Sequence, residues 1–128
     1  MANNKKTSLY IAEFLNFVSA CEKEFTVNEE KQKIQEKLTQ DYLHKLELDH
    51  LDRNERSKLA TALRDNRRER RKAKDVVEQT AAIVAFFSEP ANTKFLNRLR
   101  EVLGQVRKVE RYQNYRTYLP KILTEDKE

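Results

Sequence analysis

The sequence predicts an all-α protein, and three observations lead to that class. Only one glycine and two prolines occur in 128 residues, so the tight turns that connect β-strands are scarce. Lys, Glu, Arg, Leu, Gln and Ala dominate, and these residues favour helix. With 37% charged and 38% hydrophobic residues, the chain suits an elongated bundle better than a deep globular core. We expect a single domain over residues 1–128, built from about four helices, with 1–6 and 124–128 frayed.

The first helix is expected from Ser8 to Phe25, with Thr7 or Ser8 as its cap. Its apolar residues recur at intervals of three and four, which is typical of one buried helix face. This stripe is Ile11, Phe14, Val18, Cys21 and Phe25, widened by Tyr10 and Phe17.

A second helix is expected to start at Thr26, because Thr26 and Glu29 form a capping-box pattern. It should run to about Glu47. The inward face predicted for it consists of Ile34, Leu38, Tyr42 and Leu46.

The third helix is predicted to be the longest, over residues 53–88, or about 54 Å. Asp52 and Glu55 form a second capping-box pattern at its start, and Pro90 ends it. No glycine or proline interrupts it. A heptad seam runs along it: Leu59, Leu63, Asn66, Arg70, Ala73, Val77, Thr80, Val84 and Phe87.

A fourth helix is expected over residues 93–117, capped by Asn92 or Thr93 and limited by Pro120. Gly104 costs helix stability there, so it is expected to mark a close contact between helices. The seam predicted for this helix is Phe95, Leu99, Val102, Val106 and Val109.

The short connection near Pro90 predicts that the 53–88 and 93–117 helices form an antiparallel hairpin. Pairing Phe87 with Phe95 would bring Ala73 opposite Val109 and Asn66 near Arg116. The polar seam residues around Asn66 would then either open to solvent or be covered by the 26–47 helix.

Residues 64–74 carry seven positive and two negative charges, a local net of +5, which equals the net charge of the whole chain. Residues 1–51 net −2 by contrast. In the predicted hairpin this basic run lies beside the end of the last helix, where tyrosines also occur, Tyr118 among them. The candidate binding residues are Arg64, Arg67, Arg68, Arg71, Lys72, Lys74, Arg107, Lys108, Arg111, Tyr112, Tyr115 and Arg116.

Arginine binds phosphates and tyrosine stacks on unpaired bases, so this surface favours nucleic acid or a nucleoprotein as partner. An acidic protein partner and simple solvation of an exposed helix are the two alternatives. A homodimer through an intermolecular helix pair is also open.

The chain lacks the patterns that enzymatic sites need. A single glycine cannot build a phosphate-binding glycine loop, and His44 and His50 lack the spacing of a zinc-binding helix. Cys21 is the only cysteine, so no internal disulfide is possible, and its place on an apolar stripe indicates a buried hydrophobe. No signal peptide or membrane span is evident. We expect a cytoplasmic, non-enzymatic protein that needs no cofactor or metal.

Three segments, 42–48, 51–55 and 63–75, together with Val109–Tyr112 and Tyr115-Arg116, resemble a family of small helical proteins. These are accessory proteins carried by temperate phages and integrated elements of Gram-positive bacteria. The similarity covers roughly residues 40–119. It implies a bacterial host cytoplasm and assigns no functional residue.

That context implies two classes of function. One is an accessory protein that associates with nucleic acid in phage replication or regulation. The other is a protein-binding inhibitor of a host machine, for example an anti-CRISPR-like inhibitor of a nucleic-acid-guided defence nuclease. This basic chain would act through an acidic protein surface.

Overall fold

The computed structural model describes residues 6–117 and Ile122, and these residues form three α-helices. They are α1 (Thr7–Leu48), α2 (Arg53–Ser88) and α3 (Pro90–Tyr115). The all-α class is confirmed. The expected number of helices is corrected to three within this part of the chain, because the first two predicted helices are one.

α1 continues without a break through the capping-box pattern that was expected to start a second helix. The Thr26 hydroxyl donates to the Glu22 carbonyl at 3.1 Å, and Asn28 Nδ2 donates to the Glu24 carbonyl at 2.8 Å. Both side chains therefore bond one turn back, as threonine and asparagine do inside a helix. With 42 residues, or about 63 Å, α1 rather than α2 is the longest helix.

α2 begins and ends at the predicted residues. The Glu55 backbone N–H donates to Asp52 Oδ1 at 2.8 Å, and the Asp52 backbone N–H donates to Glu55 Oε1 at 3.1 Å. This reciprocal pair confirms the second capping box.

The corner between α2 and α3 consists of Glu89 alone, and Pro90 is the first residue of α3. Asn92 Nδ2 donates to the Phe86 carbonyl at 2.8 Å, and the Thr93 hydroxyl donates to the Phe87 carbonyl at 2.7 Å. The expected cap at Asn92 or Thr93 is wrong, because α3 begins earlier, with Glu89 as its N-cap and no side-chain cap. Both residues lie in the first turn of α3 and satisfy carbonyls at the end of α2. These bonds hold the first turn of α3 against the last turn of α2.

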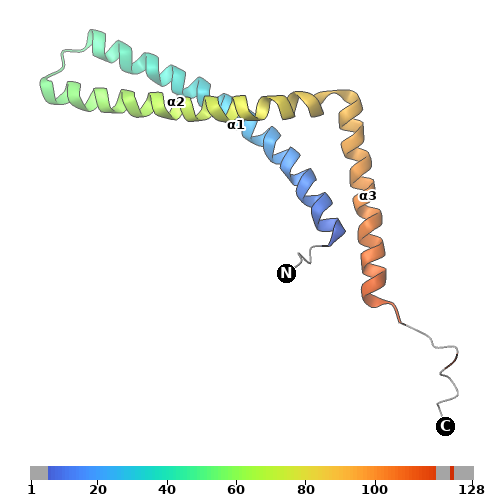
Figure 1. Ribbon diagram of the computed structural model, residues 1–128. Coiled ribbons are helices and arrows are strands. Elements are labelled where there is room, and N and C mark those ends of the chain that lie inside the picture. Colours follow the sequence, from blue (N-terminus) through green and yellow to red (C-terminus); the bar gives the residue numbers. More distant parts are fainter. Residues whose placement is uncertain (1–5, 118–121, 123–128) are drawn as a thin grey trace.

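The predicted hairpin between the 53–88 and 93–117 helices is wrong. α2 instead packs antiparallel against the C-terminal half of α1, and α3 turns sharply away from α2 and runs beside the N-terminal half of α1 (Figure 1). A one-residue corner is shorter than the two to five residues that an antiparallel helix pair needs. The result is an elongated, open arrangement in which α1 is the common partner of both other helices.

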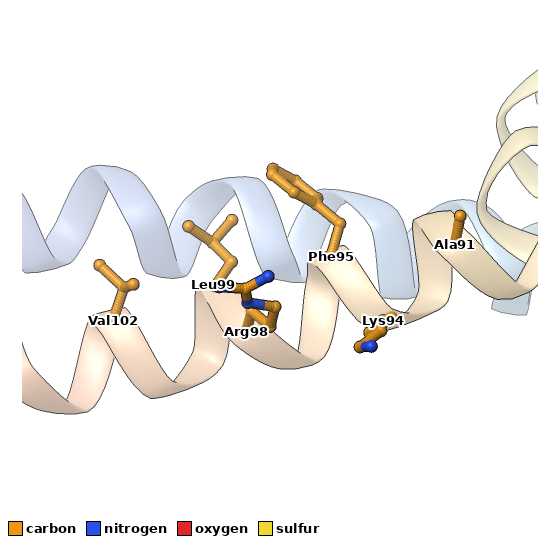
Figure 2. A pocket seen from close by; sticks show the side chains of 6 residues that line it. All are labelled: Ala91, Lys94, Phe95, Arg98, Leu99 and Val102. Carbon is orange, nitrogen blue, oxygen red and sulfur yellow. The ribbon is translucent and has the colours of Figure 1, made fainter.

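α3 buries a face that lies one residue away from the predicted seam. Leu96 and Leu103 are buried, whereas Phe95, Val102 and Val109 are exposed. Figure 2 shows Phe95 and Val102 along one side of α3. The expected close contact at Gly104 is also wrong, because no atom lies within 4 Å of the place where its Cβ would be, apart from its chain neighbours and the nearby backbone of α3 itself.

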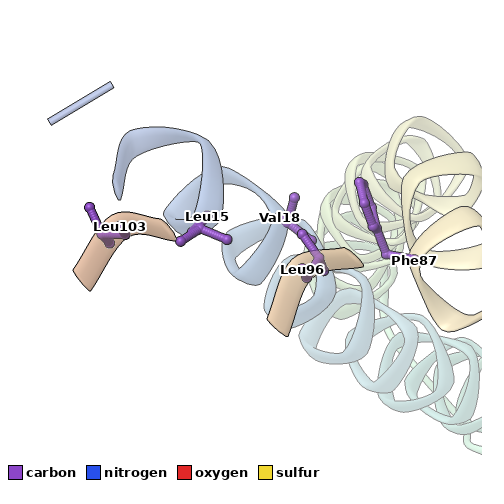
Figure 3. Close-up of a cluster of buried hydrophobic side chains, with 5 residues drawn as sticks. All are labelled: Leu15, Val18, Phe87, Leu96 and Leu103. Carbon is purple, nitrogen blue, oxygen red and sulfur yellow. The ribbon is translucent and has the colours of Figure 1, made fainter. Parts of the chain in front are cut away.

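An apolar core forms where the three helices meet. It consists of Leu15 and Val18 from α1, Phe87 from α2, and Leu96 and Leu103 from α3 (Figure 3). Ile11, Ala12, Ile83 and Leu99 pack against it. Cys21 is also buried, as expected for a small hydrophobe. This small core leaves many large apolar side chains partly exposed.

Candidate binding surfaces

The basic run of α2 divides into an inward and an outward face. Asn66 and Ala73 are buried against α1, so the residues on the opposite side of the helix face solvent. Arg64, Arg68 and Arg71 follow one another at intervals of four and three, which places them on that outer side with Lys72 beside them. We call Arg64, Arg68, Arg71 and Lys72 the α2 ridge.

Two arginines of the run turn toward α1 instead. Arg70 Nε lies 2.5 Å from Glu36 Oε2, and Arg67 Nη1 lies 3.4 Å from the same oxygen. Arg67 also donates to the Thr39 hydroxyl at 3.3 Å. Glu36 thus partly neutralises Arg67 and Arg70, which leaves them less available to an external anion than the ridge.

The α2 ridge keeps most of its charge available. Arg64 Nη2 lies 3.3 Å from Oδ1 of its neighbour Asp65, and Lys72 Nζ lies 3.4 Å from Glu69 Oε1. Both ion pairs are exposed, and exposed pairs are weak. Within the described residues, Arg68 and Arg71 have no ion pair. Lys74 is half-buried at the edge of the ridge and likewise has no ion pair there.

A second basic group lies at the end of α3. Arg107, Lys108, Arg111, Tyr112, Tyr115 and Arg116 are all exposed, and Tyr115 is 82% exposed. A shallow hollow beside them is lined by Lys6, Arg107, Glu110, Arg111, Asn114 and Tyr115. Tyr118, which the sequence also placed here, lies outside the described residues.

The two basic groups do not form the single surface that was predicted. Asn66 of the basic run bonds to Gln35 of α1, whereas Glu110 near the end of α3 bonds to Ser8. Twenty-seven residues of α1 separate those two contacts, or about 40 Å along the helix. The prediction failed because it depended on the α2–α3 hairpin.

Charge is unequally divided among the helices. α1 carries eight acidic and five basic residues, whereas α2 carries five acidic and ten basic residues. α3 carries two acidic and six basic residues. An anionic partner is therefore attracted to α2 and α3 rather than to α1.

Sequence reasoning missed the contact between Ser8 and Glu110. The Ser8 backbone N–H donates to Glu110 Oε2 at 3.0 Å, so the carboxylate caps the start of α1, which has no side-chain cap of its own. Hydrogen bonds from the Ser8 side chain and then its backbone lower the pKa of Glu110 below 4.5, helped by Lys6 and Arg107 and opposed by desolvation. The spacing of seven between Leu96, Leu103 and Glu110 was the available signal.

The described residues contain no group of three His, Cys, Asp or Glu side chains arranged to hold a metal ion. Among the described helices, none is both long and apolar enough to cross a membrane. Comparison of the chain with protein-family models, with curated proteins and with solved structures gives no match.

Proposed function

We propose that this protein is a non-enzymatic binding protein whose α2 ridge engages the phosphates of a nucleic acid, alone or in a nucleoprotein. The observation that carries the proposal is the pair Arg68 and Arg71. Both sit on the outer side of a helix anchored to α1, and neither has an ion pair within the described part of the chain. Arginine in that setting is suited to bind phosphate oxygens with two nitrogens at once.

The proposed contact is with the nucleic-acid backbone rather than with bases. The first aromatic residue of α2 is Phe86, so the helix that bears the ridge offers no ring beside it on which an unpaired base could stack. The ridge also spans only about 12 Å from Arg64 to Lys72. Binding should therefore depend little on sequence and on strandedness, and strongly on salt.

The tyrosines at the end of α3 lie outside this proposed surface. They are about 40 Å away along α1, so they do not share a short ligand with the ridge. The cellular context that we propose is a bacterial cytoplasm and an accessory gene of a phage or integrated element, as the sequence resemblance implies.

Mobility-shift assays at low salt test the proposal directly. Generic single-stranded DNA, duplex DNA and RNA should all be shifted, and Arg68→Glu/Arg71→Glu should abolish the shift while helicity is unchanged, because Arg and Glu have similar helix propensity. If the double variant loses activity in cells although the natural protein shifts no nucleic acid, the proposal fails. The alternative function, inhibition of a host machine through an acidic protein surface, then replaces it.

A further inference from the structure

α3 presents an apolar stripe that no other part of the described chain covers. Phe95, Val102 and Val109 recur at intervals of seven and are 53%, 41% and 53% exposed. Each precedes by one position a residue directed toward α1, namely Leu96, Leu103 and Glu110. α3 therefore has two neighbouring faces, and only one of them is used within the chain.

This stripe is hollowed at its N-terminal end. A groove of about 340 Å³ is lined by Ala91, Lys94, Phe95, Arg98, Leu99 and Val102, all of which belong to α3 (Figure 2). Most of the lining is apolar, with the two cations at one edge. A groove built on one helix alone is suited to receive the side chains of a second helix.

Exposed rings on α1 lie on the same side of the molecule. Phe14 and Phe17 precede the buried Leu15 and Val18 by one position. Because α1 and α3 run antiparallel, residues that precede the contacting positions on each helix fall on one side of the pair. Phe14, Phe17 and Phe95 together expose about 300 Å² of aromatic surface. That area is at the lower end of the largest apolar patch on a typical monomer, and such patches are often functional.

The chain as a whole also exposes more surface than a compact monomer. Its accessible surface is 10575 Å², whereas a compact monomer of 15.3 kDa exposes about 7,100 Å². The 15 residues outside the described part can contribute at most about 2,600 Å², so the described residues exceed their compact value by at least roughly 1,400 Å². A standard interface removes about 800 Å² from each partner, so burial of this face would remove much of the excess.

We propose that this face docks a second copy of the chain, through antiparallel pairing of the two α3 helices about Val102. The stripe is self-complementary in that arrangement. A two-fold axis at Val102 brings Phe95, a large side chain, opposite Val109 of the partner subunit, a small one, and the same pair forms twice. It also brings Arg98 beside Gln105 of the partner subunit, so no like charges meet, whereas parallel pairing would set Arg98 beside its own copy.

Sedimentation of the full chain without nucleic acid tests this proposal, at protein concentrations from about 1 to 100 μM. The mass should rise from 15.3 kDa to twice that value. High salt should preserve or strengthen the dimer, because each copy carries a net charge of +5. Nucleic-acid binding, by contrast, should be lost at high salt. Failure of dimerisation and failure of the proposed nucleic-acid binding can therefore be told apart.

Val102→Glu and Phe95→Glu should both give monomers with unchanged helicity, since both residues are exposed in the single chain. Asn97→Glu adds the same charge on the outer side of α3 and should leave the dimer intact. Val102→Cys should give a covalent dimer on mild oxidation, and Asn97→Cys should not.

Three results would overturn the proposal. These are a monomer at every concentration, a dimer insensitive to Val102→Glu and Phe95→Glu, and equal cross-linking at positions 97 and 102. A monomer that acquires mass only when an acidic protein is added would assign the groove to that protein instead.

Discussion

Asn66 of α2 and Thr39 of α1 form a buried polar pair, in which the Thr39 hydroxyl lies 2.6 Å from Asn66 Oδ1. Asn66 Nδ2 donates to both the backbone carbonyl and Oε1 of Gln35, at 2.8 and 2.7 Å. Asn66 is only 4% exposed, yet its amide is fully bonded. Of the two alternatives for this polar seam position, coverage by the 26–47 segment is the one that the structure adopts. The pair sets the register between α1 and α2.

Asn66→Ala should lower the free energy of unfolding by about 1–3 kcal/mol, because it removes the buried hydrogen bond with Thr39 and takes away the Asn66 donor to Gln35 Oε1. In urea unfolding, a cycle with Thr39→Val should show a coupling energy of about 0.5–3 kcal/mol. Asn97→Ala, at an exposed site on α3, is the matched control and should cost less than about 0.5 kcal/mol. Strictly additive effects of the Asn66 and Thr39 changes would contradict the pairing.

Two adjacent residues of α3 should respond very differently to the same substitution. Leu103→Asp places an unpaired charge in the core and should cost several kcal/mol, about 3 or more, whereas Val102→Asp should be mild in the monomer. Thermal melts followed by circular dichroism, at protein concentrations too low for association, measure both. Equal losses of stability in the two variants would contradict the orientation of α3, in which Leu103 faces the core and Val102 does not.

Gly104→Ala should stabilise the protein by about 1 kcal/mol, because the alanine Cβ meets open space and glycine is a poor helix former. The measurement is the midpoint of urea unfolding at unchanged slope. A loss of stability would reveal a neighbour at this position, as the sequence-based interpretation expected.

The Ser8–Glu110 contact predicts a pH dependence. Because the folded state lowers the pKa of Glu110, ionised Glu110 stabilises the fold at pH values above the ordinary value of 4.5. This contribution should disappear as pH falls through the lowered pKa. The melting temperatures of the natural chain and Glu110→Gln should therefore differ at neutral pH and converge in acid. Glu101→Gln, which removes an exposed acid from the same helix, should show no such convergence.

The sequence was sufficient for the parts of the fold that depend on neighbouring residues. The ends of α2 followed from the Asp52–Glu55 capping box and from Pro90, and both are local signals. The sequence did not indicate which helix each helix packs against. A heptad seam indicates that one face is buried, but not which helix buries it, and Asn66 could have bonded to either neighbour. On α3, the stripes containing Val102 and Leu103 share Leu99 and Val106, so periodicity alone could not choose between them.

The candidate site was likewise predicted from the sequence only in part. The exposed charges of residues 64–74 were evident from composition, and the structure displays most of them on the surface. Which residues of α3 lie beside these charges could not be predicted, because that requires the pairing of the helices to be known. The role of Glu36 in drawing Arg67 and Arg70 toward α1 was likewise hidden, since it arises from a contact across 31 residues of sequence.

The most direct test of the proposed function is the salt dependence of binding to a generic DNA duplex, measured by fluorescence anisotropy. Four ridge cations should give a log–log slope of about −3 to −4. Arg68→Glu/Arg71→Glu should abolish binding, whereas Lys108→Glu/Arg111→Glu, with the same change in net charge at the far end of α3, should retain most of it. No binding by the natural chain at tens of micromolar, or equal losses in the two double variants, would contradict the assignment of the α2 ridge as the nucleic-acid surface.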